Sequence, residues 1–109
     1  MGGEIVGKES DYEILKEGAR DKARIVGVET KRSTEVFKNS KTPEQQLIVI
    51  VANINGWIGR IGTIPKPPSK YLSPKSKMAQ FIAKYRKPPE VGMTVDAAIN
   101  EKGFWTLVL

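Results

Sequence analysis

The sequence predicts an all-β fold with one helix, a five-stranded barrel whose elements follow the order β-β-β-α-β-β. Five segments are rich in the aliphatic, β-branched and aromatic residues that favour strands. One segment, 78–85, instead places its apolar residues at the spacing of an amphipathic helix. The length of 109 residues suits one domain, which we expect over 12–109, after a flexible N-terminal tail over 1–11.

The first three strands are expected over 22–31, 47–52 and 57–64. In the first strand, apolar residues change face beside Gly27, which predicts a bulge or a sharp bend. The second is a continuous apolar run, typical of a strand buried on both faces. The lysine, asparagine, serine and proline residues over 38–43 predict the loop between these two strands.

A helix is expected between the third and fourth strands. The connector over 65–70 contains three prolines, which lack the N–H that a β-ladder needs, and we expect it to be stiff and basic. Ser73 before Pro74 is typical of an N-cap followed by the first helical residue. The apolar stripe of the helix, which we assign to the core, consists of Met78, Phe81, Ile82 and Tyr85. The last two strands are expected over 93–99, where apolar and polar residues alternate, and over 104–109.

The chain contains no cysteine and no histidine. This excludes disulfides, cysteine nucleophiles, zinc sites built from these residues and Ser-His triads. We therefore expect a binding module and not an enzyme, with no cofactor and no metal ion. No apolar run reaches the roughly 18 residues of a membrane span, and no signal-peptide pattern is present, so we expect a cytoplasmic protein without membrane contact.

The formal net charge of +6 is unevenly distributed along the chain. Residues 1–21 carry a net charge of −3, whereas residues 45–89 contain eight basic residues and no acidic one. Ordinary surfaces mix both signs of charge, so this stretch indicates a phosphate-binding face. A helix whose exposed side is rich in lysine is the alternative explanation.

The predicted element order is that of the OB-fold. Four segments resemble the small phage and archaeal single-stranded DNA-binding proteins of this fold, and they correspond to the first strand, the helix, the turn into the fourth strand and the closing hairpin: 22–29, 73–84, 89–95 and 101–105. The resemblance covers roughly residues 12–109. It implies an OB-fold protein that binds single-stranded DNA, with RNA as the alternative, and with little sequence preference.

Binding of a single strand requires cations along the backbone and flat side chains on which bases stack. OB-folds present these groups on the second and third strands and in the neighbouring loops. Trp57 and Arg60 of the third strand are candidates, but residues three apart on a flat strand face opposite sides unless Gly59 carries a bulge. A core position for Trp57 is equally compatible with the sequence.

Further candidates lie in the loop after the first strand and on the connector. The expected phosphate contacts of the loop are Lys31, Arg32, Lys38 and Lys41. Those of the connector are Lys66 and Lys70, with Tyr71 as a stacking residue. A solvated loop, and packing of Tyr71 against the start of the helix, are the alternatives. Phe37 is ambiguous, and burial of both Phe104 and Trp105 is favoured.

Two other functions are compatible with the sequence. The first is a protein-interaction or assembly module without nucleic-acid binding, since OB barrels serve many partners. An open final strand, 107–109, would allow a homodimer through strand pairing, which would also lengthen a nucleic-acid groove. The second is a metal-dependent nuclease, in which Asp21 and Glu29 would hold Mg²⁺ and Lys31 would orient a water.

Overall fold

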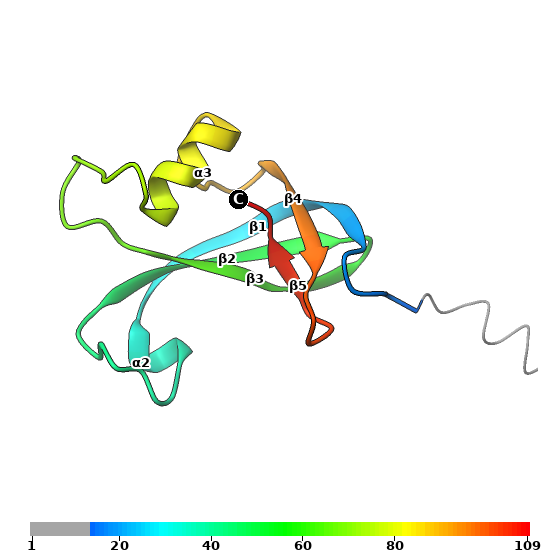
Figure 1. Cartoon of the computed structure of the whole chain (residues 1–109), viewed down its shortest axis with the longest axis horizontal. Helices are drawn as coiled ribbons and strands as arrows, with labels where there is room; N and C mark the ends of the chain where they lie inside the picture. Colours follow the sequence, from blue (N-terminus) through cyan, green and yellow to red (C-terminus); the bar gives the residue numbers. More distant parts are fainter. Residues whose placement is uncertain (1–13) are drawn as a thin grey trace, which may run out of the picture.

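The computed structural model describes residues 14–109, so the expected tail over 1–11 lies outside the described residues. Five antiparallel strands form a nearly closed barrel (Figure 1). They are β1 (Arg20–Arg32), β2 (Gln46–Ile54), β3 (Trp57–Pro65), β4 (Thr94–Ile99) and β5 (Trp105–Leu107). The helices are α2 (Ser33–Val36) and α3 (Lys77–Tyr85). The predicted fold class is confirmed, with α3 between the third and fourth strands.

The strands follow the order β3-β2-β1-β4-β5 around the barrel. The two end strands, β3 and β5, come back together across Gly62, where an added Cβ would lie 3.3 Å from Cβ of Leu107. Within the described residues these two strands are not hydrogen-bonded neighbours. The barrel is therefore closed by side-chain packing along this seam between β3 and β5.

Strand β1 is long enough to serve both halves of the barrel. Its residues 20–24 pair with β4, and residues 24–32, apart from Val26, pair with β2. The register with β2 shifts between Ile25 and Gly27, which leaves Val26 as the extra residue of a bulge. The irregularity predicted beside Gly27 is confirmed.

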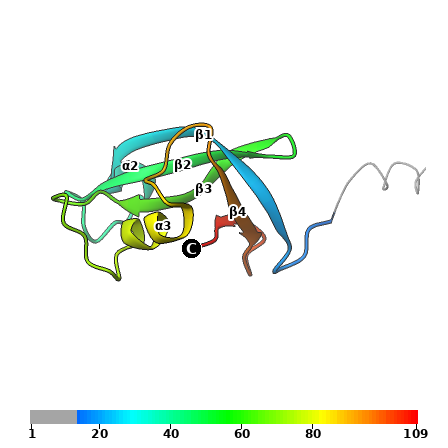
Figure 2. The same ribbon diagram turned by 90° about the horizontal axis from the view of Figure 1, so that it is seen from above.

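The core lies inside the barrel and under α3. Its largest fully buried side chains are Phe81, Ile25, Ile50, Ile64 and Val95. The predicted stripe of α3 is confirmed, since Met78 and Phe81 are buried and Ile82 and Tyr85 pack against the core. Figure 2, like Figure 1, places α3 beside the C-terminal end of the chain. The Tyr85 hydroxyl makes this contact by donating to the Val108 carbonyl at 2.8 Å.

Helix α3 begins one turn later than the sequence predicts. Its N-cap is Ser76, whose hydroxyl accepts a hydrogen bond from the Ala79 N–H at 3.1 Å. Ser73 instead closes a separate turn, in which its carbonyl accepts from the Ser76 N–H at 3.0 Å. The Ser73 hydroxyl accepts only a long hydrogen bond, from the Lys75 N–H at 3.4 Å, so it does not cap α3. At the other end Arg86, with φ of +74°, closes the helix before the prolines.

The short helix α2 was not predicted, because four residues are too few to show a helical period. It is held at the end of β1, where the Arg32 N–H donates to the Glu35 carboxylate at 2.8 Å. The Ser33 N–H donates to the Gln45 carbonyl at 2.8 Å, and the Ser33 hydroxyl, which is buried, contacts that of Ser40. These bonds fold the loop after β1 into an ordered lobe.

Candidate functional site

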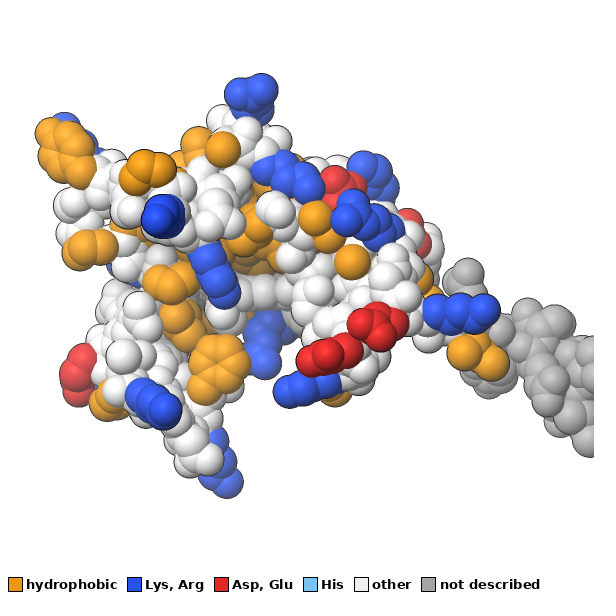
Figure 3. Space-filling model, viewed as in Figure 1, with side chains coloured by type: hydrophobic (Ala, Val, Ile, Leu, Met, Phe, Trp, Pro, Cys, Tyr) orange, Lys and Arg blue, Asp and Glu red, His pale blue; other side chains and the backbone are white. Residues whose placement is uncertain are grey.

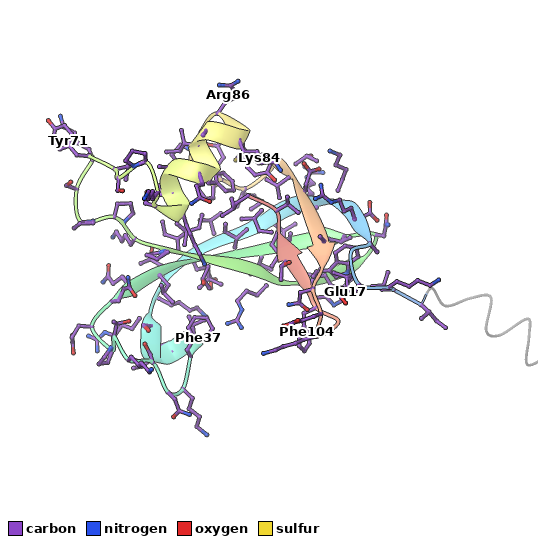
Figure 4. All side chains as sticks on the ribbon, in the orientation of Figure 1. Glu17, Phe37, Tyr71, Lys84, Arg86 and Phe104 are labelled. Atoms are coloured by element: carbon purple, nitrogen blue, oxygen red, sulfur yellow. The ribbon has the colours of Figure 1, made fainter. Side chains whose placement is uncertain are left out.

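A groove of about 630 Å³ runs along the seam between β3 and β5. Figure 3 shows the surface hollowed here, between the lobe that contains α2 and the tip of the β4–β5 loop. Four aromatic and two basic side chains line it: Phe37, Trp57, Phe104, Trp105, Arg60 and Lys102. In Figure 4, Phe37 and Phe104 mark its two sides.

Phe37 comes from the α2 lobe, on one side of the groove. The backbone N–H of Phe37 donates to the Ser33 carbonyl at 2.8 Å, while its ring stays 46% exposed. The Arg60 guanidinium carbon lies 5.4 Å from the centre of this ring, which is the geometry of a cation–π contact. Within residues 14–109, Arg60 has no carboxylate partner. Its charge is therefore available to a phosphate.

Trp57 reaches the groove because Gly59 has no side chain. The indole lies across Gly59 so closely that an added Cβ would be 2.5 Å from the indole Cζ2. The strand has its bulge at Ile61 and not at Gly59, since the register shifts between the pairs of Arg60 and Gly62. Trp57 is 44% exposed, so the alternative of a core position is wrong.

The opposite side of the groove is the loop between β4 and β5. The Asn100 side-chain oxygen accepts hydrogen bonds from the N–H groups of Lys102 and Phe104, at 3.0 and 2.9 Å. Gly103, with φ of +85°, completes the turn. Phe104 is thereby left 65% exposed, whereas Trp105 is half-buried against the core. The expected burial of both aromatic residues is wrong for Phe104, because it precedes the first paired residue of β5.

None of the four candidate cations around the first loop lines this groove, although Phe37, which does, lies between them in the sequence. Lys38 directly follows Phe37 and is exposed, as is Lys41. Arg32 is the last residue of β1, paired with Gln46. The ammonium group of Lys31 lies 3.5 Å from the carboxylate of Glu29 on the same strand.

The connector residues do not join the groove. Lys66 and Tyr71 line a separate pocket of about 410 Å³, between the connector and the start of α3. Tyr71 is 79% exposed, and the Lys70 ammonium lies 5.3 Å from the centre of its ring. Figure 4 shows Tyr71 far from Phe104, at the other end of the molecule. The sequence analysis did not identify Lys102 as a groove residue. The signal that could have indicated it is its place between the last two strands, in a loop that OB-folds use for binding.

The groups with displaced pKa values lie outside the groove. The Lys22 ammonium donates to the Asp96 carboxylate at 2.6 Å, which lowers the pKa of Asp96 and raises that of Lys22. Burial raises the pKa of the Tyr85 hydroxyl, which accepts from the Asp96 N–H at 3.1 Å. This cluster joins β1, α3 and β4 and is structural.

The carboxylates of the nuclease hypothesis do not come together. Asp21 and Glu29 are eight residues apart on β1, which corresponds to about 26 Å along a strand. Within residues 14–109, no three Asp or Glu side chains gather as metal ligands would.

Comparison with known proteins assigns no family. No family model matches the chain, and no curated protein and no solved structure matches it. In the part of the chain that the structure describes, no helix has the length and apolar character needed to cross a membrane.

Proposed function

We propose that the groove between β3 and β5 binds single-stranded nucleic acid, DNA in preference to RNA and largely independently of sequence. The observation that carries this proposal is the gathering of four aromatic and two basic side chains in one groove. Aromatic faces accept every base by stacking, and cations follow the phosphates. The preference for DNA comes from the resemblance of the sequence to single-stranded DNA-binding proteins.

In this proposal the bases stack on Trp57 and on the exposed ring of Phe104, while Arg60 and Lys102 contact phosphates. Each of these side chains comes from β3 or from the β4–β5 loop. The strand then continues toward the α2 lobe, because Phe37 lines the groove on that side. The Arg60 guanidinium lies over the Phe37 ring and meets the backbone of the strand there.

The loop cations extend this track. Lys38 and Lys41 follow Phe37 in the α2 lobe, and Lys31 and Arg32 lead into it. The connector group, Lys66, Lys70 and Tyr71, forms a second contact for strands that are longer than the groove. The setting that fits such a protein is DNA replication or repair in the cytoplasm.

The first test is a titration of the intrinsic tryptophan fluorescence with oligo-dT at several salt concentrations. Trp57 and Trp105 both line the groove, so stacking should quench their emission. Affinity should fall linearly in log salt as phosphate contacts are screened. Duplex DNA of equal length is the control and should bind more weakly. No response to oligo-dT at low salt would refute the proposal.

A protein-assembly module is the second candidate. The pocket beside the connector combines Pro67, Pro68 and the exposed Tyr71, a surface that also suits a peptide. A homodimer through the C-terminal strand would have to enter the seam, because β5 is paired with β4 on one side and lies beside β3 on the other. Sedimentation with labelled oligo-dT separates these candidates, because an assembly module would not carry the oligomer with it.

A further inference from the structure

A second cavity, of about 360 Å³, lies next to the groove and shares three aromatic residues with it. Trp57, Phe104 and Trp105 line both hollows, so they form a wall with a space on either side. The volume lies within the range of about 300–1,000 Å³ that is usual for small-molecule pockets. A base that leaves the groove therefore finds a space of suitable size directly behind the stacking wall.

The lining of this cavity combines apolar and polar side chains. Leu15, Ala19 and the buried Ile54 are among the apolar ones. The polar ones are Arg20, Asp21 and Asn55. A flat, apolar ring with one hydrogen-bonding edge is the ligand that such a lining fits.

The polar groups are held in fixed positions. The Asn55 Nδ2 donates to Asp21 Oδ2 at 2.5 Å, and Asp21 Oδ1 accepts from the Lys22 N–H at 2.7 Å. Asn55 has a φ of +50° and, with Gly56 at +91°, forms the tight turn between β2 and β3. Within the described residues no cation lies within ion-pair distance of Asp21. A carboxylate offers about four acceptor positions, so this one still has acceptor capacity.

We infer that this cavity binds one nucleobase of the strand and prefers guanine, an inference that rests on the proposed function of the groove. The Watson–Crick edge of guanine places two donors, N1–H and the N2 amino group, side by side. They match the two oxygens of the Asp21 carboxylate. Thymine presents one N–H between two carbonyls, and adenine and cytosine present an amino group beside a ring acceptor, so each of them sets a lone pair against the carboxylate.

The protein then binds most of the strand without regard to sequence and reads one position. The wall of Trp57 and Phe104 separates the base in the cavity from its neighbours in the groove. Arg20, which also lines the cavity, supplies a cation for the phosphate of the inserted nucleotide. A guanine within a thymine tract should therefore bind more tightly than the tract alone.

The test compares oligo-dT with the same oligomer that carries one central dG, dA, dC or deoxyinosine, by fluorescence titration of the full-length protein. A bidentate contact predicts a preference of about fivefold to tenfold for dG over dT. Deoxyinosine lacks the N2 amino group and should lose most of this preference. Equal affinity for all five oligomers, with oligo-dT binding intact, would overturn the inference and leave the proposed function standing. No binding of oligo-dT would overturn both.

The variant that tests the site is Asp21→Asn, which keeps the size of the side chain. It should abolish the dG preference, measured as the ratio of the affinities for the dG oligomer and for oligo-dT. Glu17→Gln is the matched control, because it removes the same charge from an exposed residue that lines neither hollow. It should keep the preference. A dG preference that survives in Asp21→Asn would refute the assignment.

Asn55→Gly provides a second variant in case Asp21→Asn does not fold. Glycine accepts the positive φ of this position, so the turn is kept while the amide that orients Asp21 is removed. The dG preference should fall at least threefold, which is about 0.65 kcal/mol. An unchanged preference in a folded Asn55→Gly protein would contradict a role for this pair.

Discussion

Replacing Gly59 with alanine tests how the Trp57 indole is presented to the groove. An added Cβ would lie 2.5 Å from the indole Cζ2 and 2.6 Å from Cη2. Carbon atoms in contact are normally about 3.5–4.0 Å apart, so the ring must leave its place. The φ of Gly59 is not positive, so the alanine itself strains no backbone, and the effect should be confined to the indole.

The expected loss of affinity follows from the stacking that the proposed function assigns to the indole. Stacking of one base on an aromatic side chain contributes about 1–3 kcal/mol. Gly59→Ala should therefore weaken oligo-dT binding about 5- to 150-fold. The free energy of unfolding should change by less than about 1 kcal/mol, because Trp57 is already 44% exposed and alanine restricts the unfolded chain more than glycine does.

The assay is a fluorescence-anisotropy titration with labelled oligo-dT, accompanied by a thermal melt of each protein. Gly27→Ala is the matched control, because a Cβ there would lie 3.5 Å from Cβ of Val51, an ordinary contact. That variant should bind as the wild type does. If Gly59→Ala also binds oligo-dT with wild-type affinity, the stacking role of Trp57 in its present orientation is refuted.

The remaining predictions concern charge, a buried hydroxyl and pH. Arg60→Ala should reduce the slope of log affinity against log salt by about one, measured by titration at four salt concentrations. Lys75 lies outside the groove, so Lys75→Ala should leave the slope unchanged. Tyr85→Phe removes the hydroxyl that joins α3 to the backbone of β4 and of Val108. The free energy of unfolding, measured by urea titration, should fall by about 1–3 kcal/mol. A smaller loss would count against a stabilising role of this hydroxyl. The pKa of Asp96 is held below its ordinary 3.8 by Lys22, so this contact stabilises the fold above that pH and the stabilisation is lost as the pH falls through the lowered pKa. The difference in melting temperature between wild type and Asp96→Asn should therefore shrink in acid. A difference that stays constant with pH would contradict the stabilising contact between Lys22 and Asp96.

The barrel was predictable because each of its elements leaves a local signal. The change of apolar face beside Gly27 indicated the bulge that lets β1 pair with both β2 and β4. The spacing of Met78 and Phe81 indicated the buried face of α3. Such signals depend on residues that are close in sequence, and they identify elements more reliably than they identify sites.

The groove was only partly predictable, because it is assembled from segments far apart in the sequence. Phe37 and Phe104 are ambiguous in sequence and become its two sides only when α2 and the β4–β5 loop meet β3. The contact between Trp57 and Gly59 is a side-chain conformation, which no periodicity encodes. Tyr71 lies beside basic residues in the sequence, as a stacking residue of a binding site would. The structure nevertheless places it on the connector, far from Phe104 (Figure 4).

The missing ladder between β3 and β5 determines how the barrel responds to ligands of different thickness. In the described part of the chain these strands are held together by packing, as between Leu107 and Gly62, and not by paired backbone hydrogen bonds. Side-chain contacts weaken gradually as surfaces separate, whereas a ladder loses whole hydrogen bonds. The circumference of the barrel can therefore expand at this line without breaking its ladders, and under the proposed function this would accommodate purines and pyrimidines alike.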